Sequence, residues 1–486
     1  MNENNSILPL FIFLLIYLID YILSENFIND RRSIIKLKIK GNNFQQIIGS
    51  KPFPDFIYLN NSLTLIDDLG RIFIESENEN EINIVTLIWN QKINTCDNLF
   101  KSSTSIEIDL SNFDNSIVTS MKSMFENCQQ LKYINFGDIN TSSVLDMSNL
   151  FYNCISLTSL DLSRFDTSKV KLMDSMFNNC NLLTSLDITN FNTSKVVSIN
   201  SMFCECNSLL EIDLSYMDVS KVTNMQYLFK KCLVLTSLNL SNFNTSNVIS
   251  MNGLFTNCRL LKKLEISNLD TSKVEDMNSM FYDCESLTSL DLTNFDTFLV
   301  EDMGFMFYFC QSLIYVDIST FDTTNVNDMK YMFYYCSSLK SLDLSNFFLY
   351  EVIMESFLEL STSLEYVKFS NDSENSAYGF AMFAECFSLK SIDLYEFSFI
   401  GDLGFLFSGC NLLKSLDLSL VDKIRVTSMY NLFEYCYSLK SLNLSNLVTY
   451  SVDNIEAMFY DCKSLTSIDL SNFDTSSVTS MDKVFF

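Results

Sequence analysis

The chain has 486 residues, and its 59 Asp and Glu outnumber its 32 Lys and Arg, which gives a net charge of −27. This charge repels nucleic acid and anionic lipid head groups, so we exclude nucleic acid as a partner. The absence of histidine removes the commonest general base and metal ligand. Only 10 Gly leave no glycine-rich phosphate loop. Because 48% of the residues are hydrophobic, we expect a large core. Because histidine and a glycine-rich loop are both missing from the sequence, we expect a protein that is not an enzyme and takes no cofactor or metal.

The N-terminus carries an apolar run at residues 7–19. This run is shorter than a membrane span and typical of the core of a secretory signal. We therefore expect residues 1–24 to be a signal peptide and the protein to be secreted or on the cell surface, in an extracellular, oxidising compartment. An uncleaved anchor and a buried core helix remain the alternatives.

A repeat occupies residues 96–486. An anchor Phe recurs sixteen times from Phe100 through Phe177 and Phe357 to Phe485, and thirteen of these copies carry a Cys three residues later in the pattern [ML]F..C. Twelve of the fifteen intervals between anchors are 26 residues long. Self-similarity at this period is typical of a solenoid, in which each repeat buries its apolar face only against its neighbours.

Within one repeat the apolar period changes. Residues 159–163 (SLDLS) alternate as in a half-buried strand, and residues 166–168 (DTS) are typical of a turn or a helix cap. From Val170 to Cys180 the apolar residues are three and four positions apart, which predicts a helix of about ten residues. The predicted fold class is α/β: a parallel strand ladder with one short helix per repeat.

The same residues carry a family resemblance. LTSLDLSRF (157–165) fits leucine-rich spacing, and the continuation FDTS.V..M..MF..C.SL resembles the BspA-like leucine-rich-repeat surface proteins and the related repeats of mycoplasmal surface lipoproteins. The resemblance covers about residues 96–486. It implies a surface protein that works in adhesion or other protein contacts, and it brings no catalytic residues. Relatives with a lipid anchor carry a cysteine after the signal, whereas no cysteine precedes Cys96 here.

Three segments depart from the repeat. Residues 25–95 contain four candidate strands (33–40, 56–66, 71–74 and 82–89) and read as a β-rich N-terminal cap, with a separate binding domain as the alternative. Residues 347–383 form an irregular unit, either a decayed repeat or a ligand loop. The final MDKVFF lies inside a repeat, which we interpret as truncation with loss of a C-terminal cap or anchor. The alternative is that this open end contacts another chain.

Thirteen of the 15 cysteines share one repeat position, and Cys96 and Cys204 do not. A metal ladder is disfavoured because one thiol per repeat supplies no close pair of ligands. A bridge is disfavoured because stacked side chains point the same way, whereas a disulfide turns its Cβ atoms toward each other. We therefore interpret this column as buried thiols, with some bridging and a Cys96–Cys204 pair left open.

The outward side of the predicted strands carries an acidic column. Its members are Asp109, Asp161, Asp187, Asp213, Glu265, Asp291, Asp317, Asp343, Asp393, Asp417 and Asp469. We take this column as the candidate concave, partner-binding face, which would recognise a basic or polar protein segment. A merely solvated face and a calcium site are the alternatives; a flat ladder offers calcium few ligands.

Seven Asn lie in N-x-[ST] sequences, which would make a secreted chain a glycoprotein. These candidates are Asn60, Asn140, Asn192, Asn239, Asn244, Asn371 and Asn443. The function we expect is non-enzymatic protein binding or adhesion by a secreted or surface-displayed solenoid. The alternative is a structural or self-associating coat protein. We expect contact with a membrane only through an uncleaved N-terminal anchor or a lost C-terminal one.

Overall fold

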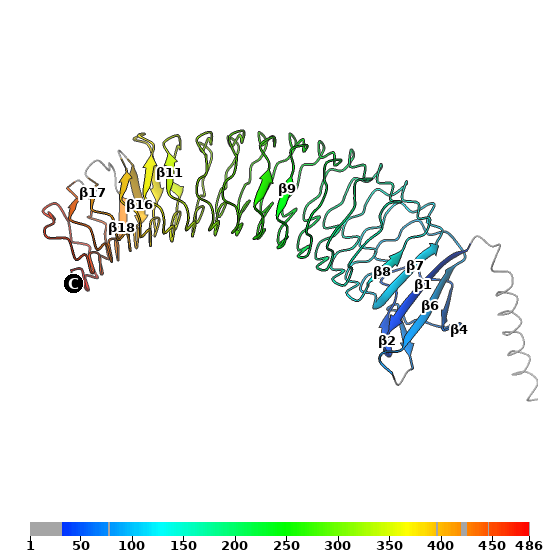
Figure 1. The fold of residues 1–486 in the computed structure, drawn as a ribbon. Coiled ribbons are helices and arrows are strands. Elements are labelled where there is room, and N and C mark those ends of the chain that lie inside the picture. The colour runs from blue at the N-terminus through cyan, green and yellow to red at the C-terminus, as the bar shows by residue number, and fades with distance from the viewer. Residues whose placement is uncertain (1–31, 76–77, 395–396, 419–424, 446, 486) are drawn as a thin grey trace, which may run out of the picture.

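The repeats stack into a curved arc that starts from a small sheet at the N-terminal end (Figure 1). The structure is a computed structural model, and it describes residues 32–75, 78–394, 397–418, 425–445 and 447–485. The predicted signal peptide, residues 1–24, lies outside these ranges. No segment of the described chain forms a helix that could cross a membrane.

A six-stranded sheet leads into the repeats, with the strand order β4-β3-β6-β1-β7-β8. Its strands are β1 (Ser33–Lys40), β3 (Phe56–Leu59), β4 (Ser62–Thr64), β6 (Ile82–Trp89), β7 (Ser105–Asn112) and β8 (Tyr133–Asn135), and β2 (Asn43–Gln46) pairs separately with β5 (Arg71–Ile74). β1 pairs antiparallel with β6 and β7, whereas β7 pairs in parallel with β8. The pairing therefore becomes parallel where the repeats begin.

Alternation explains the strands of this sheet. In β1, Ile35, Leu37 and Ile39 are fully buried, while the lysines between them are exposed. The strands predicted at 33–40, 71–74 and 82–89 occur with those bounds, and the strand predicted at 56–66 is the hairpin of β3 and β4. The boundary of a cap at residue 95 remains a prediction.

The repeats contribute parallel ladders. One ladder includes β9 (Ser237–Asn239), β10 (Lys263–Glu265), β11 (Ser341–Leu344), β13 (Tyr366–Phe369), β15 (Ser391–Asp393), β17 (Ser415–Asp417) and β19 (Ser441–Asn443). A second ladder includes β12 (Val352–Ile353), β14 (Ser376–Tyr378), β16 (Ser398–Asp402) and β18 (Arg425–Ser428). Single bridges extend the second ladder through the earlier repeats, for example Asp276 to Asp302.

The predicted helix in each repeat is wrong, because no helix occurs among the described residues. Two successive turns stand in its place, at residues 173–180 of the repeat analysed above, and we call this stretch the turn segment. The N–H groups of Met176 and Cys180 donate to carbonyls three residues back, at 3.3 and 3.1 Å. Ser175 and Asn179 have left-handed backbones, with φ of 52° and 61°, as the third residue of a type II turn requires.

Four N–H groups of the turn segment, those of Met173, Ser175, Phe177 and Asn179, bond to the next repeat. Phe177 donates to the carbonyl of Met202 at 3.0 Å, and Asn179 donates to that of Cys204 at 2.7 Å. An α-helix would close these donors onto its own carbonyls. The fold is therefore a β-solenoid in which both strands and turns are hydrogen-bonded from repeat to repeat.

A column of stacked Phe rings fills the core. Phe177 and Phe203 are fully buried, and their ring centroids lie 5.9 Å apart with an interplanar angle of 1°. The column breaks after Phe333, whose ring meets Phe357 edge-on at 77°. The hydrogen-bond register places Leu358 at the anchor position, since Leu358 donates to Met382 as each anchor Phe donates to the residue before the next anchor. Phe357 is therefore not the anchor of the irregular unit.

The thiol column is confirmed as buried and unbridged. All 15 cysteines are free, and all are buried except the half-buried Cys462. Each thiol of the column donates to the carbonyl of the anchor residue in the preceding repeat, as Cys180 does to Phe151 at 3.3 Å. In the irregular unit, the hydroxyl of Ser361 makes this bond to Phe333 at 2.9 Å. The column is therefore a ladder of hydrogen-bond donors inside the core.

The DTS stretch shapes a turn and caps no helix. The N–H of Ser168 donates to the carboxylate of Asp166 at 2.9 Å. The buried hydroxyl of Thr167 donates to the carbonyl of Asn192 at 3.0 Å and accepts from its N–H at 2.8 Å. Thr167 thus contributes a further connection between neighbouring repeats.

Candidate functional site

The acidic column predicted from the sequence lies along the strand ladder, on a surface that we call the strand face. Its exposed members are Asp161, Asp187, Asp213, Glu265, Asp291, Asp343, Asp417 and Asp469, and its half-buried members are Asp109, Asp317 and Asp393. Strand pairing aligns equivalent positions, such as Glu265 with Asn239. In Figure 1 the labelled repeat strands run between the inner and outer edges of the arc.

The strand-face carboxylates are oriented by their own turns. Oδ1 of Asp161 accepts the hydroxyl of Ser163 at 2.6 Å and its N–H at 3.1 Å. Thr189 donates in the same way to Asp187. These side-chain and backbone bonds hold the pKa of Asp161 and of Asp187 below the usual value. The carboxylates are therefore ionised at neutral pH and fixed in direction before any partner arrives.

A groove of about 700 Å³ crosses four repeats of the strand face. Its lining includes the carboxylates of Asp187, Glu211, Asp213 and Glu265 but only one cation, Lys263. The groove is shallow and open, and it follows the direction in which the repeats stack. Its shape and charge suit an extended, positively charged segment better than a small enclosed ligand.

The seven candidate glycosylation residues are exposed. Asn60 differs from the others, because its amide donates to Asn83 at 2.8 Å and its oxygen accepts the N–H of Ile84. Exposure is compatible with modification, and glycosylation remains a prediction.

A second surface, which the sequence analysis missed, is built from the turn segments, and we call it the turn face. It carries an aromatic patch of seven half-buried side chains: Tyr282, Phe305, Tyr308, Phe309, Tyr331, Tyr334 and Tyr335. The signal was present in the sequence, since NNC at residues 178–180 becomes YDC, YFC and YYC at residues 282–284, 308–310 and 334–336.

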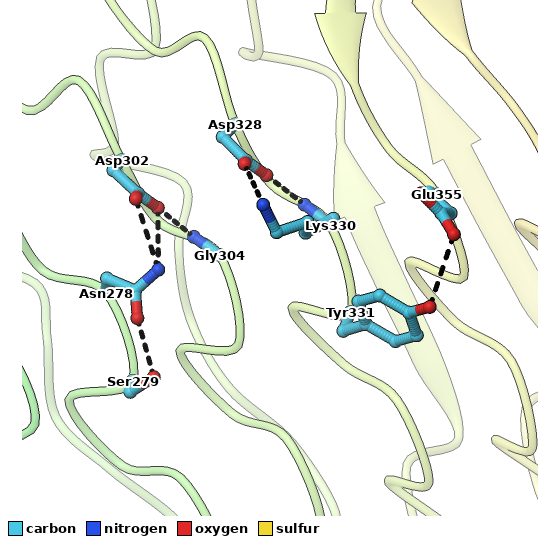
Figure 2. Close-up of polar contacts among 8 residues, drawn as sticks. All are labelled: Asn278, Ser279, Asp302, Gly304, Asp328, Lys330, Tyr331 and Glu355. Carbon is cyan, nitrogen blue, oxygen red and sulfur yellow. Dashed lines mark hydrogen bonds and ion pairs between the residues drawn. The ribbon is translucent and has the colours of Figure 1, made fainter.

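Carboxylates border this patch (Figure 2). Asp302 accepts the amide of Asn278 at 3.0 and 3.1 Å and the N–H of Gly304 at 2.7 Å. Asp328 accepts the N–H of Lys330 at 2.8 Å and its ammonium group at 2.6 Å. Burial raises the pKa of Asp302. The turn face therefore combines rings with carboxylates that are partly shielded from water.

A family model spans most of the repeats. The model described as "Mycoplasma protein of unknown function, DUF285" matches residues 67–183, 129–237, 158–264, 231–347 and 379–486. The chain belongs to this DUF285 family. No curated protein matches the DUF285 chain.

Several solved structures resemble the DUF285 chain weakly. The TLR13–ssRNA13 complex shares 20% identity at a TM-score of 0.26, over 74% of this chain and 46% of that chain. The internalin InlF of Listeria monocytogenes shares 16% identity at a TM-score of 0.25, over 78% and 86%. The plant peptide hormone receptor RGFR1 with RGF2 shares 16% identity at 0.24, over 74% and 61%. The DUF285 chain thus spans less than half of the TLR13 chain, and TM-scores this low carry no conclusion about partners.

Proposed function

We propose that the DUF285 chain is a non-catalytic binding protein that works outside the cell and recognises a protein partner through its strand face. On the basis of the repeat motif, we also propose that the chain is related to the BspA-like leucine-rich-repeat surface proteins. The apolar run at residues 7–19 supports the extracellular location. The observation that carries the proposal is the strand-face groove, whose four carboxylates outnumber the one lysine beside them. Two of these carboxylates, Asp187 and Asp213, are oriented by hydrogen bonds from their own turns.

The chemistry of the partner follows from the spacing of these charges. The strand face presents a carboxylate in most repeats. Neighbouring strands lie about 4.8 Å apart, so the carboxylates of neighbouring repeats lie about 5 Å apart. Two such charges repel by about 0.8 kcal/mol in water, and salt weakens this repulsion. A basic, extended segment would relieve the repulsion along several repeats at once. We therefore assign the strand face a basic protein segment as its partner.

The test is a selection from a random peptide display library against residues 32–486. We expect the selected peptides to carry net positive charge. We also expect them to bind a variant with Asp161→Lys, Asp187→Lys and Asp213→Lys at least about tenfold more weakly than the unchanged chain. Binding is measured by fluorescence polarisation at physiological salt.

A matched variant separates charge from structure in this test. Asp161→Asn, Asp187→Asn and Asp213→Asn keep an oxygen that accepts the turn hydrogen bonds, as Asn239 does from the N–H of Ser241 at 2.9 Å. This variant removes the charge without disturbing the turn, so it should also lose binding while its unfolding curve stays unchanged. Selected peptides that bind all three proteins equally would leave the strand face as a solvated surface.

A further inference from the structure

The aromatic patch on the turn face forms continuous stacks across three repeats. The ring centroids of Tyr282 and Tyr308 lie 4.6 Å apart at 12°, and those of Tyr308 and Tyr334 lie 4.8 Å apart at 7°. Beside them, Phe309 and Tyr335 stack at 4.7 Å. All these rings are half-buried rather than enclosed. A rigid apolar surface with phenol groups therefore reaches the solvent at this part of the arc.

This surface carries a conformational cost. Phe305, Phe309, Tyr331 and Tyr335 all have left-handed backbones, with φ between 55° and 60°. Bulky residues rarely adopt this conformation, and strain of this kind gathers at functional sites. Elsewhere the same positions carry residues better suited to it, such as Asn179, so the repeat does not need rings there. Local folding therefore does not explain the four rings.

The turn face already holds cations between a ring and a carboxylate. The ammonium group of Lys330 lies 2.6 Å from Asp328 and 5.9 Å from the ring centroid of Phe305. Further along, the ammonium group of Lys463 lies 3.0 Å from Asp461 and 4.7 Å from the ring centroid of Tyr437. Such a position stabilises a cation through both the charge of the carboxylate and the face of the ring.

At the C-terminal side of the patch, rings and carboxylates occur together, and no cation of the described residues is paired with these carboxylates. The hydroxyl of Tyr331 donates to Glu355 at 3.2 Å (Figure 2). Burial and the nearby Glu385 and Glu355 raise the pKa of Glu359. Within the described ranges, no Lys or Arg forms an ion pair with Glu355 or Glu359. Negative charge is thus concentrated beside the rings, and the nearest cation, Lys330, forms its ion pair with Asp328 instead.

We propose that Tyr331 and Tyr334, together with Glu355 and Glu359, bind an arginine side chain on an exposed segment of a partner protein. A guanidinium group is planar and weakly hydrated, so it packs against aromatic rings and bonds to carboxylates in the same pose. This site lies on the turn face and uses none of the strand-face carboxylates, so it goes beyond the function proposed above.

The test compares two labelled peptides on residues 32–486 by fluorescence polarisation at physiological salt. The probe is Gly-Arg-Gly-Arg-Gly-Arg-Gly, and the control replaces each Arg by citrulline, which has nearly the same shape but no charge. We expect the arginine peptide to bind about tenfold more tightly than the citrulline peptide.

Two variants locate the binding. The first variant, Tyr331→Ser with Tyr334→Asn, removes both rings. It uses the residues found at the same positions in other repeats, as at Ser279 and Asn178. The second variant, Glu355→Gln with Glu359→Gln, removes both charges and keeps the shape of the side chains. Each double variant should lose about tenfold in affinity for the arginine peptide. The glutamine variant keeps the test decisive if the ring variant does not fold.

All of these comparisons are made in a chain that carries Asp187→Asn with Asp213→Asn, so that binding in the strand-face groove does not contribute. Within this background, Asp166→Asn with Asp270→Asn serves as the matched control and should not weaken binding of the arginine peptide, because these exposed carboxylates accept turn N–H groups that Asn192 also accepts. Equal binding of the two peptides would overturn the proposal. An equal loss in the control would also overturn it, because the peptide would then be following the overall charge.

Discussion

In reducing buffer, raising the pH above 9 is expected to unfold the solenoid cooperatively, with a midpoint at about pH 10. Burial is the largest cause of a raised pKa for every cysteine of the thiol ladder; it raises the pKa of Cys128, Cys180 and Cys258 to about 12. In the unfolded chain these thiols have the ordinary thiol pKa of 9.0.

The sign of this pH effect follows from proton binding. Between about pH 9 and pH 12 the unfolded chain loses thiol protons that the folded chain keeps, so the free energy of unfolding falls as the pH rises. Each thiol contributes about 1.4 kcal/mol per pH unit in this window. The buried thiols act together, so a small rise in pH outweighs the marginal stability of an ordinary domain. Burial also raises the pKa of Tyr308 to about 12, which acts in the same direction above pH 10.

The measurement is far-UV circular dichroism and Trp89 fluorescence between pH 7 and pH 11. A matched variant replaces Cys180, Cys206 and Cys232 by Ser, which makes the same bond at Ser361 without ionising near pH 9. The free energy of unfolding of this variant at pH 7 serves as its own baseline. Its free energy of unfolding should fall less per pH unit than that of the unchanged chain, by the contribution of three thiols. A chain that stays folded to pH 11, or a variant with the unchanged slope, would contradict the buried thiol ladder.

Phe203→Ala is expected to lower the free energy of unfolding by about 3–5 kcal/mol. Phe203 is fully buried and stacks on Phe177 at 5.9 Å and on Phe229 at 5.6 Å. The carbonyl of Phe203 also accepts the thiol of Cys232 at 3.3 Å. A cavity at this point weakens the contacts with both neighbouring repeats, and in a solenoid these contacts supply most of the stability.

The matched control is Phe485→Ala. Phe485 stacks on one ring only among the described residues, Phe459 at 5.3 Å, and is 57% exposed. Its loss should therefore cost less than about 1 kcal/mol. Urea unfolding gives both values, and hydrogen exchange should show the greatest loss of protection in the repeats around Phe203. Equal effects of the two substitutions would contradict the stacked core.

The sequence was sufficient for the period and for the buried columns. Val170, Met173, Met176, Phe177 and Cys180 are all fully buried, as their spacing predicts. The same spacing of three and four positions also fits two successive type II turns, so periodicity cannot separate the two conformations. The choice depends on carbonyls 25 residues further along the chain, which a local pattern does not reveal. The residues at positions 175 and 179, Ser and Asn, were the local sign of the turns.

The candidate site was predictable to a similar degree. Strand alternation places Asp161 and its equivalents outward, whereas the hydrogen bonds from Ser163 that orient this carboxylate depend on the turn after the strand. The aromatic patch was missed because each ring, taken alone, fits a hydrophobic repeat. In the irregular unit, adjacent Phe357 and Leu358 both fit the anchor by type, and only the register of the hydrogen bonds decides between them.

Site-specific photo-crosslinking on intact cells tests most directly whether this chain binds a protein partner outside the cell through its strand face. A photoreactive phenylalanine replaces Ser185 or Ser237 in the groove, or Val197 as an exposed control outside its lining. The cells are intact, so that a quenching reagent reaches only their exterior. We predict protein adducts from the two groove positions and none from position 197. Adducts from all three positions, or from none, would contradict the account.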